Sequence, residues 1–278
     1  MGILTYGYDS SFIGTTITLK GFQKDFGISK MTKAQQNDVS SNLTSVYSAG
    51  GFFGALFMYF SLELLGRKMT IIISDFFFIL GAVLTVGPVS LGTMYAGRVL
   101  TGFGVGGIAA VAPTYVSEMA PPAIRGRLTG FFESFYQVGA VIGFWINYGV
   151  THNLNVNSRV AWRIPFGVQL IPAGLLTIFI PFLKESPVWL LKKDRSEDAI
   201  KVYSFIRNLP ADHRYIAEDV AFVRGQIEYE RAVTGGHGSF WANLKAAGKE
   251  ARMKGMRNRF ALVFLMFMWQ ACKLIPLI

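Results

Sequence analysis

The feature that most constrains the fold of this chain is a series of seven apolar segments, each close to the length that a helix needs to cross a bilayer. A membrane-spanning helix takes about 20 mainly apolar residues, because the hydrocarbon core is about 30 Å thick and a helix rises about 1.5 Å per residue. The predicted spans cover residues 1–19, 46–65, 69–89, 91–116, 128–150, 162–183 and 260–278. This pooling of apolar residues predicts an all-α integral membrane protein.

The composition supports the same interpretation. Charged residues make up only 16% of the 278 residues and hydrophobic residues 51%, whereas a soluble domain carries about 25% charged residues. Cys272 is the only cysteine, which excludes an intramolecular disulfide and a multi-cysteine metal site. The three histidines, His152, His213 and His237, are interpreted as surface residues rather than ligands. We therefore expect no metal and no cofactor.

The basic residues indicate membrane topology rather than nucleic-acid binding. The formal net charge is +10, but the basic residues are not interleaved with stacking aromatics on a soluble domain. Fifteen of the 27 Lys and Arg lie between Lys184 and Arg259. The short loops after the second and fourth spans add four more: Arg67, Lys68, Arg125 and Arg127. The positive-inside rule then predicts that these loops and the long hydrophilic stretch face the cytoplasm.

Three parts follow from this layout: a six-span bundle over 1–183, a cytoplasmic helical linker over 184–258 and a partial seventh span over 259–278. In the linker, Ser186 followed by Pro187 predicts a helix start, a second helix begins near Ser196, and a third covers about 211–232. The first span is not a signal peptide, because it has no basic start and contains Asp9. We expect both ends of the chain to be incomplete.

Glycines recur at helix-packing spacing. The pairs Gly50/Gly54 and Gly139/Gly143 follow the GxxxG pattern, and the run LTGFGVGGIAA at 100–110 is rich in glycine. That run could suggest a dinucleotide-binding loop, but no strand precedes it and the segment is long enough to span. We interpret all three as faces where helices approach closely in lipid.

Ionisable side chains inside the predicted spans are the candidate functional residues, because they are costly in lipid. Asp9 in the first span and Arg98 in the fourth can pair, and a proton arriving at the carboxylate would release the arginine. The alternatives are a static pair that orients helices, or an Arg98 that extends to one interface. Glu133 in the fifth span either binds hydroxyls of a polar solute or lies near the cytoplasmic end of its helix. Asp75 in the third span has no partner in the sequence.

The segment RVLTGFGVGGIAAVAPTYVSEMAPPAIRGR at 98–127 fits the signature of a known family. Over residues 7–270 the chain resembles the sugar porters of the major facilitator superfamily, and GYDSSFIGT, GFWINYGV and NLPADH are most similar to fungal hexose and quinate permeases. The resemblance implies the amino-terminal six-helix bundle of that fold, followed by cytoplasmic helices and the partial seventh span. After Gln270 the likeness stops, where the family would continue with Gly-Ile-Asn and five more spans.

The resemblance also implies residue roles. Asp9 and Arg98 match the proton-coupling pair, and Glu133 and Gln270 match solute contacts, with glutamate at 133 as in quinate-type permeases. The cytoplasmic gating motifs of the family match Glu63, Gly66, Arg67, Lys68, Glu118, Arg125 and Glu185. Three positions of these motifs depart from the pattern: Glu63 replaces an aspartate, Leu64 stands where a basic residue is common, and Val188 replaces an arginine.

The function that follows is secondary active transport, with proton-coupled uptake of a hexose across the plasma membrane as the leading hypothesis. The partners would be a sugar or polyol, protons and the lipid bilayer, without nucleic acid. The alternatives are a quinate or polyol permease, a sugar sensor that does not transport, and an inactive truncated fragment. A polytopic membrane enzyme is disfavoured, because no nucleophile and base set or metal-ligand cluster occurs near one interface.

Overall fold

The computed structural model describes residues 1–88, 90–234, 261 and 265, and the described residues are helical with short connections. They fall into two compact units, Met1–Ala211 and Asp212–Ile278. The first unit contains α1 (Gly2–Ile17), α2 (Lys20–Asp25), η1 (Ile28–Lys30), α3 (Lys33–Leu65), α4 (Arg67–Val86), α5 (Leu91–Met119), α6 (Arg125–Asn153), α7 (Arg159–Val168), α8 (Leu170–Phe179), η2 (Ile180–Phe182), α9 (Pro187–Lys192) and α10 (Ser196–Arg207). In the second unit, α11 covers Arg214–Thr234.

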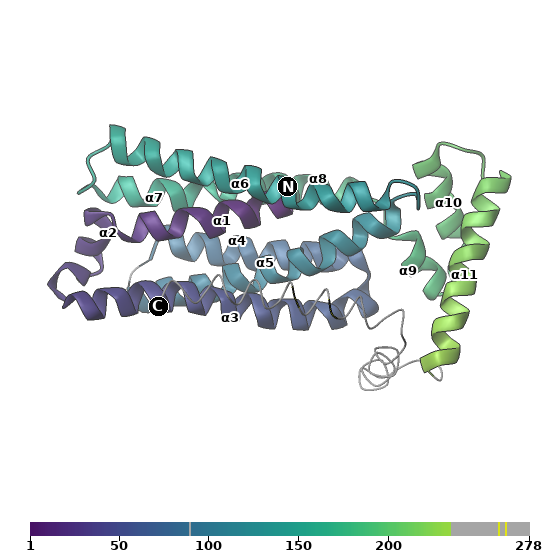
Figure 1. Cartoon of the computed structure of the whole chain (residues 1–278), viewed down its shortest axis with the longest axis horizontal. Helices are drawn as coiled ribbons and strands as arrows, with labels where there is room; N and C mark the ends of the chain where they lie inside the picture. The colour runs from purple at the N-terminus through teal and green to yellow at the C-terminus, as the bar shows by residue number, and fades with distance from the viewer. Residues whose placement is uncertain (89, 235–260, 262–264, 266–278) are drawn as a thin grey trace. The chain divides into compact units, whose positions relative to one another are not determined.

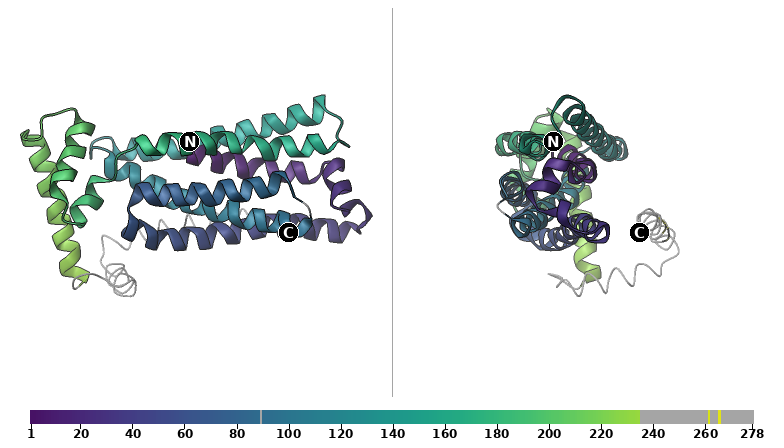
Figure 2. Two further views of the ribbon diagram at one scale, coloured as in Figure 1. Left: turned by 180° about the vertical axis from the view of Figure 1, so that it is seen from behind. Right: turned by 90° about the vertical axis from the view of Figure 1, so that its left-hand side faces the viewer.

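Helix α5 lies at the centre of the helical bundle in the first unit. It packs against α3 and α4 along most of its length and also contacts α1 and α6 (Figure 1). Helix α6 packs mainly against α1, while α8 contacts both α4 and α1. Viewed from one end in Figure 2, these long helices are seen nearly along their axes. This packing places two ionisable side chains that are costly in lipid, Asp9 of α1 and Arg98 of α5, in the interior of the bundle.

Six of the seven predicted spans fall on helices of the first unit. By length and composition, four stretches of the described residues could cross a membrane: α3, α4, α5 and the stretch Arg159–Phe182, which comprises α7, α8 and η2. Helix α1 has 16 residues, which is shorter than a full span, and α6 has 29 residues but is not among the four. The seventh predicted span lies outside the described residues except for positions 261 and 265.

Two helices differ from the predicted spans. Helix α3 begins at Lys33 rather than near residue 46, because Thr32 and Gln35 form a capping box that starts the helix within a polar segment. The predicted span 162–183 is divided into α7, α8 and η2. Helix α7 ends at Val168, four residues before Pro172, whose nitrogen has no hydrogen to donate to that carbonyl.

The glycine faces predicted from the sequence are confirmed as contacts between helix backbones. A Cβ atom on Gly54 would collide with the carbonyl oxygen of Phe103, and one on Gly139 with that of Leu4. Gly106 lies equally close to the backbone of Gly51. Small residues therefore set the approach of α3 to α5 and of α6 to α1.

Short helices follow the bundle much as predicted. Ser186 caps α9 by accepting from the Trp189 N–H at 3.3 Å, and Pro187 is the first helical residue. Helix α10 begins at Ser196. The Arg195 guanidinium, which donates to the Asp198 carboxylate at 2.7 Å, holds the pKa of that exposed carboxyl below its usual range. The predicted division at residues 183 and 258 stays a prediction.

Candidate functional site

An ion pair between α1 and α5 is the most buried charged feature of the described residues. Arg98 Nη1 donates to Asp9 Oδ1 at 2.8 Å, and both side chains are 0% exposed. Asp9 lies on a face of α1 that also buries Tyr8 and Phe12, and Arg98 lies among the glycines of α5. The structure thus brings together the two residues that were predicted to pair.

Tyr47 of α3 completes this cluster. The Arg98 guanidinium carbon lies 4.3 Å from the centre of the Tyr47 ring, within the range of a cation–π contact. Four buried polar atoms of the cluster have no hydrogen-bond partner among the described residues: Asp9 Oδ2, Arg98 Nε, Arg98 Nη2 and the Tyr47 hydroxyl. One short bond and one ring face therefore hold two opposite charges that have lost their hydration.

This geometry makes the pair a poor stabiliser. The attraction within a buried pair offsets desolvation only when the geometry is good and the remaining donors and acceptors are satisfied. Here Arg98 gives a single bond to the carboxylate rather than the parallel pair that a guanidinium can form. Such a single bond is less costly to break than a bidentate one.

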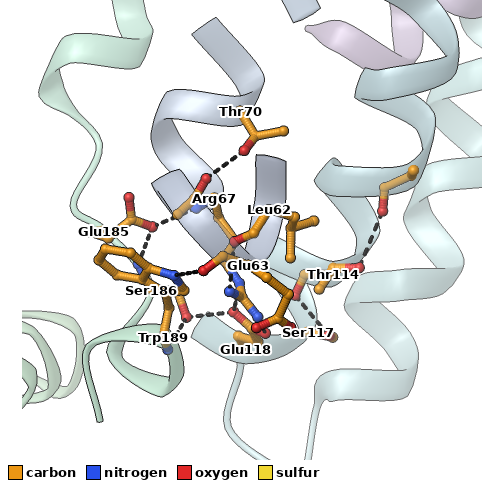
Figure 3. Close-up of polar contacts among 12 residues, drawn as sticks. Leu62, Glu63, Arg67, Thr70, Thr114, Ser117, Glu118, Glu185, Ser186 and Trp189 are labelled. Atoms are coloured by element: carbon orange, nitrogen blue, oxygen red, sulfur yellow. Dashed lines mark hydrogen bonds and ion pairs between the residues drawn. The ribbon is translucent and has the colours of Figure 1, made fainter. Parts of the chain in front are cut away.

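A second cluster, the junction network, lies where α3 meets α4 and consists of Arg67, Glu118, Glu185, Ser186 and Trp189 (Figure 3). Arg67 forms two parallel bonds to Glu118, from Nε at 2.8 Å and from Nη2 at 2.7 Å. Ser186 Oγ donates to the same carboxylate at 2.5 Å. In contrast to the pair at Asp9, this ion pair has the bidentate geometry that gives a strong contact.

Glu185 closes the start of α4. Its Oε1 accepts from the backbone N–H of Arg67 at 2.9 Å and of Lys68 at 3.3 Å, and also from the N–H of Ser186 at 2.8 Å. A carboxylate is favoured there because the first N–H groups of a helix have no intrahelical partner. Gly66, at φ +93°, is required just before, since a Cβ would lie 2.6 Å from Glu185 Oε2.

The remaining predicted site residues lie outside these two clusters or at their edge. The Glu63 side chain is exposed, and its carbonyl oxygen accepts from Trp189 Nε1 at 3.2 Å. Arg125 is exposed at the first residue of α6. Glu133 is exposed on α6, where it accepts from Gln137 Nε2 at 3.0 Å. Gln270 lies outside the described residues.

Several residues that contact the predicted site residues were not identified from the sequence. Tyr47 gave no signal, because an aromatic residue in an apolar span is ordinary. Ser186 was expected to cap α9, but its bond to Glu118 joins residues 68 positions apart. Asp75, which had no predicted partner, lies 2.5 Å from the hydroxyl of Thr177 on α8. A polar residue in an apolar span was the only available signal for Thr177.

One family of known proteins matches nearly the whole chain. The profile of the family described as "Sugar (and other) transporter" matches residues 1–275. This chain belongs to that family. Among curated proteins, this chain is 48% identical over 267 residues to a probable quinate permease of Aspergillus fumigatus, covering 95% of this chain and 48% of the relative. It is 45% identical over 267 residues to a quinate permease of Emericella nidulans, again covering 95% and 48%.

Solved structures give the same fold. One is the xylose transporter XylE from E. coli in a partially occluded inward-open conformation, with a TM-score of 0.74, 22% identity, and coverage of 84% of this chain and 58% of that one. Another is XylE carrying two tryptophan substitutions, with a TM-score of 0.76, 21% identity, and coverage of 86% and 53%. The predicted all-α major-facilitator fold is therefore confirmed, and this chain is a multi-pass membrane protein.

The match covers only part of each curated relative. The chain spans about half the length of the curated relatives that it matches. Those relatives are named as permeases rather than enzymes, in keeping with the expectation of transport. Roles of individual residues remain predictions that rest on the geometry above.

Proposed function

We propose that this chain forms the amino-terminal half of a proton-coupled secondary carrier for a small polyhydroxylated solute. The observation that carries the proposal is the Asp9–Arg98 pair, whose two side chains are 0% exposed and 2.8 Å apart between α1 and α5. An intramembrane carboxylate paired with a cation is costly in lipid and marks a functional site, where the carboxylate is the group that can take up a proton.

The proposed coupling step is a proton transfer to Asp9. Protonation neutralises the carboxylate and removes the charge that holds Arg98, so the 2.8 Å bond loses its ionic character. Arg98 then keeps its contact with the Tyr47 ring while its Nη1 becomes free to bond elsewhere. Because α1 and α5 each carry one partner, the change of charge alters the contact between two helices of the bundle.

The proposed solute is quinate or a closely related polyol. The names of the curated relatives, at 45% and 48% identity, favour quinate over the hexose expected from the sequence. Glu133 and Gln137 present an exposed, hydrogen-bonded acceptor and donor on α6, suited to the hydroxyls of either solute. In carriers of this kind two helical halves rock around a central site, so this face would form one wall of it.

The junction network would serve as the latch of the rocking motion. Its ion pair, Arg67 with Glu118, ties α4 to α5, and Glu185 ties the segment after η2 to the start of α4. We place this network in the cytoplasm and the carrier in the plasma membrane, with residues 184–258 as a cytoplasmic linker. The basic short loops support that orientation.

Uptake into proteoliposomes tests the proposal. The chain is joined to the second half of the Emericella nidulans quinate permease, and labelled quinate and glucose are offered with and without an inward proton gradient. We expect the gradient to drive quinate accumulation, and Asp9→Asn to abolish accumulation while exchange of solute persists. Asp25→Asn is the control, because Asp25 pairs with Arg159 at 2.9 Å in another part of the bundle. Accumulation that ignores the gradient would count against coupling.

A further inference from the structure

A second acidic side chain is buried in the bundle, away from the pair on α1 and α5. Asp75 lies on α4 and is 2% exposed, and its Oδ1 has no hydrogen-bond partner among the described residues. Its Oδ2 lies 2.5 Å from the hydroxyl oxygen of Thr177 on α8, a residue 102 positions away in the sequence. The carboxyl group therefore has one neutral neighbour and one unpartnered oxygen.

The Thr177 hydroxyl would bond differently in the two protonation states of Asp75. The Thr177 hydroxyl also lies 3.2 Å from the carbonyl oxygen of Ala173, and a hydroxyl has one hydrogen to donate. If Asp75 were ionised, that hydrogen would serve the carboxylate, and the charge would have no second donor. In the structure Thr177 Oγ1 is placed as donor to Asp75 Oδ2. If Asp75 is protonated, its O–H can instead donate to Thr177 while Thr177 donates to the Ala173 carbonyl, so that no charge is left with a single donor.

The charges around α4 offer Asp75 no counter-ion. Helix α8 and η2 contain no ionisable residue. On α5, Arg98 is paired with Asp9 and Glu118 with Arg67. On α4 itself, Arg67 is held by Glu118 and Lys68 Nζ donates to the Pro181 carbonyl at 2.7 Å.

The other helices that pack against α4 give the same result. On α7, Arg159 pairs with Asp25 and Arg163 lies over the Trp162 ring. The charged residues of α3 are all exposed: Lys33, Asp38 and Glu63. The tyrosines of α3 and α5 bear no positive charge that could balance a carboxylate: Tyr47, Tyr59, Tyr95 and Tyr115.

We infer that Asp75 is a proton-binding site separate from Asp9, which holds a neutral carboxylic acid between α4 and α8 and donates its hydrogen bond to Thr177. Binding is a simple protonation, in which a proton adds to Oδ2 of the carboxylate and no other bond changes. An unpaired charge at such a position is costly, whereas a neutral acid with one good bond is tolerated. This inference does not rest on the proposed transport function.

The site links proton occupancy to the contact of α4 with α8. While the two helices pack together, the acid is shielded from water and keeps its proton. Loss of the proton would require Asp75 to reach water or a cation, and thus a separation of the two helices at Thr177. Asp75 is therefore expected to hold its proton more readily in the packed state than when the two helices separate.

Infrared spectroscopy of the purified chain in detergent tests the site, because a carboxylic acid and a carboxylate absorb at different C=O frequencies. At mildly acidic pH we expect the wild-type chain to show a carboxylic-acid band that disappears in Asp75→Asn. We expect Thr177→Val to keep that band and shift it to higher frequency, since the acid loses its acceptor. Asp25→Asn is the matched control and should leave the band unchanged.

The outcomes separate this inference from the proposed function. A wild-type spectrum without the band, or a band unchanged in Asp75→Asn, overturns it. A band that instead disappears in Asp9→Asn assigns the neutral acid to the α1–α5 pair, which also overturns the inference while leaving proton coupling intact. Circular dichroism of each variant checks that the helices are retained, and Thr177→Val provides a readout if Asp75→Asn does not fold.

Discussion

Asp9 and Arg98 form an ion pair that receives few hydrogen bonds from neighbouring groups. Three of their buried polar atoms, Asp9 Oδ2, Arg98 Nε and Arg98 Nη2, lack hydrogen-bond partners among the described residues. Removing one member of such a pair leaves an uncompensated charge, whereas removing both members takes the charges away together. Each member of the pair therefore depends on the other to compensate its charge, whereas the pair as a whole adds little to the stability of the bundle.

This asymmetry predicts the stability of the pair's variants. Asp9→Leu and Arg98→Met alone should each lower the free energy of unfolding by about 3–5 kcal/mol, because each strands the opposite charge. The double variant should lie near the wild-type value, since similar apolar volume replaces both charges. The measurement is reversible unfolding in mixed detergent micelles, followed by circular dichroism. A double variant well below the wild-type value would show that the pair is a net stabiliser, and strictly additive losses would show that the two residues do not interact.

Tyr47 allows the ring and the hydroxyl to be separated. Its ring lies 4.3 Å from the Arg98 guanidinium carbon, and its hydroxyl has no partner among the described residues. Tyr47→Phe should therefore leave the free energy of unfolding unchanged or slightly higher, because a buried unsatisfied group is removed. Tyr47→Leu should lower it by roughly 0.5–2 kcal/mol through loss of the cation–π contact. Equal losses in both variants would point to the hydroxyl instead of the ring.

At the scale of helices, backbone contact at glycine decides the packing. Gly54 of α3 lies so close to the carbonyl of Phe103 on α5 that an added methyl group would meet backbone, which cannot rotate away. Gly149 on α6 has nothing within 4 Å of its added Cβ. The two positions give a matched pair, since both are glycines inside long helices.

Alanine at these positions should act in opposite directions. Gly54→Ala should lower the free energy of unfolding by about 1–3 kcal/mol, because α3 and α5 must move apart. Gly149→Ala should raise it by about 0.5–1 kcal/mol, since glycine in a helix carries an entropic cost relative to alanine. Detergent unfolding of the two variants side by side measures both effects. A neutral Gly54→Ala would mean that the α3–α5 contact is looser than the structure has it.

These elements mark what sequence reasoning could reach. Apolar runs located the spans, GxxxG spacing located the faces at Gly54 and Gly139, and the Ser186–Pro187 pair located the start of α9. The break of the sixth span before Pro172 and the early start of α3 at Thr32 depend on local hydrogen bonds that apolar runs do not record. Contacts such as Thr177 with Asp75 join distant positions, so they follow only from the three-dimensional packing.

At the scale of the whole molecule, the distribution of charge implies an orientation that the fold by itself leaves open. The short loops that contain Arg67 and Lys68, and Arg125 and Arg127, lie on the same side as the basic stretch after residue 183 in the predicted topology. Short loops weigh most in the positive-inside rule. The loop between α6 and α7, which contains Asn157, is then expected outside.

Cysteine labelling in cells tests this orientation with a clean background, because Cys272 is the only cysteine of the chain. In a Cys272→Ser chain, Asn157→Cys and Glu197→Cys each place one exposed thiol, before α7 and in the first turn of α10. We expect a membrane-impermeant maleimide to label Asn157→Cys in intact cells and Glu197→Cys only after the membrane is permeabilised. The reverse pattern would invert the topology, and the junction network would then latch the outer side of the bundle. Labelling of both thiols in intact cells would mean that the segment between α6 and α10 crosses the membrane an even number of times, against the single crossing that Arg159–Phe182 has room to make.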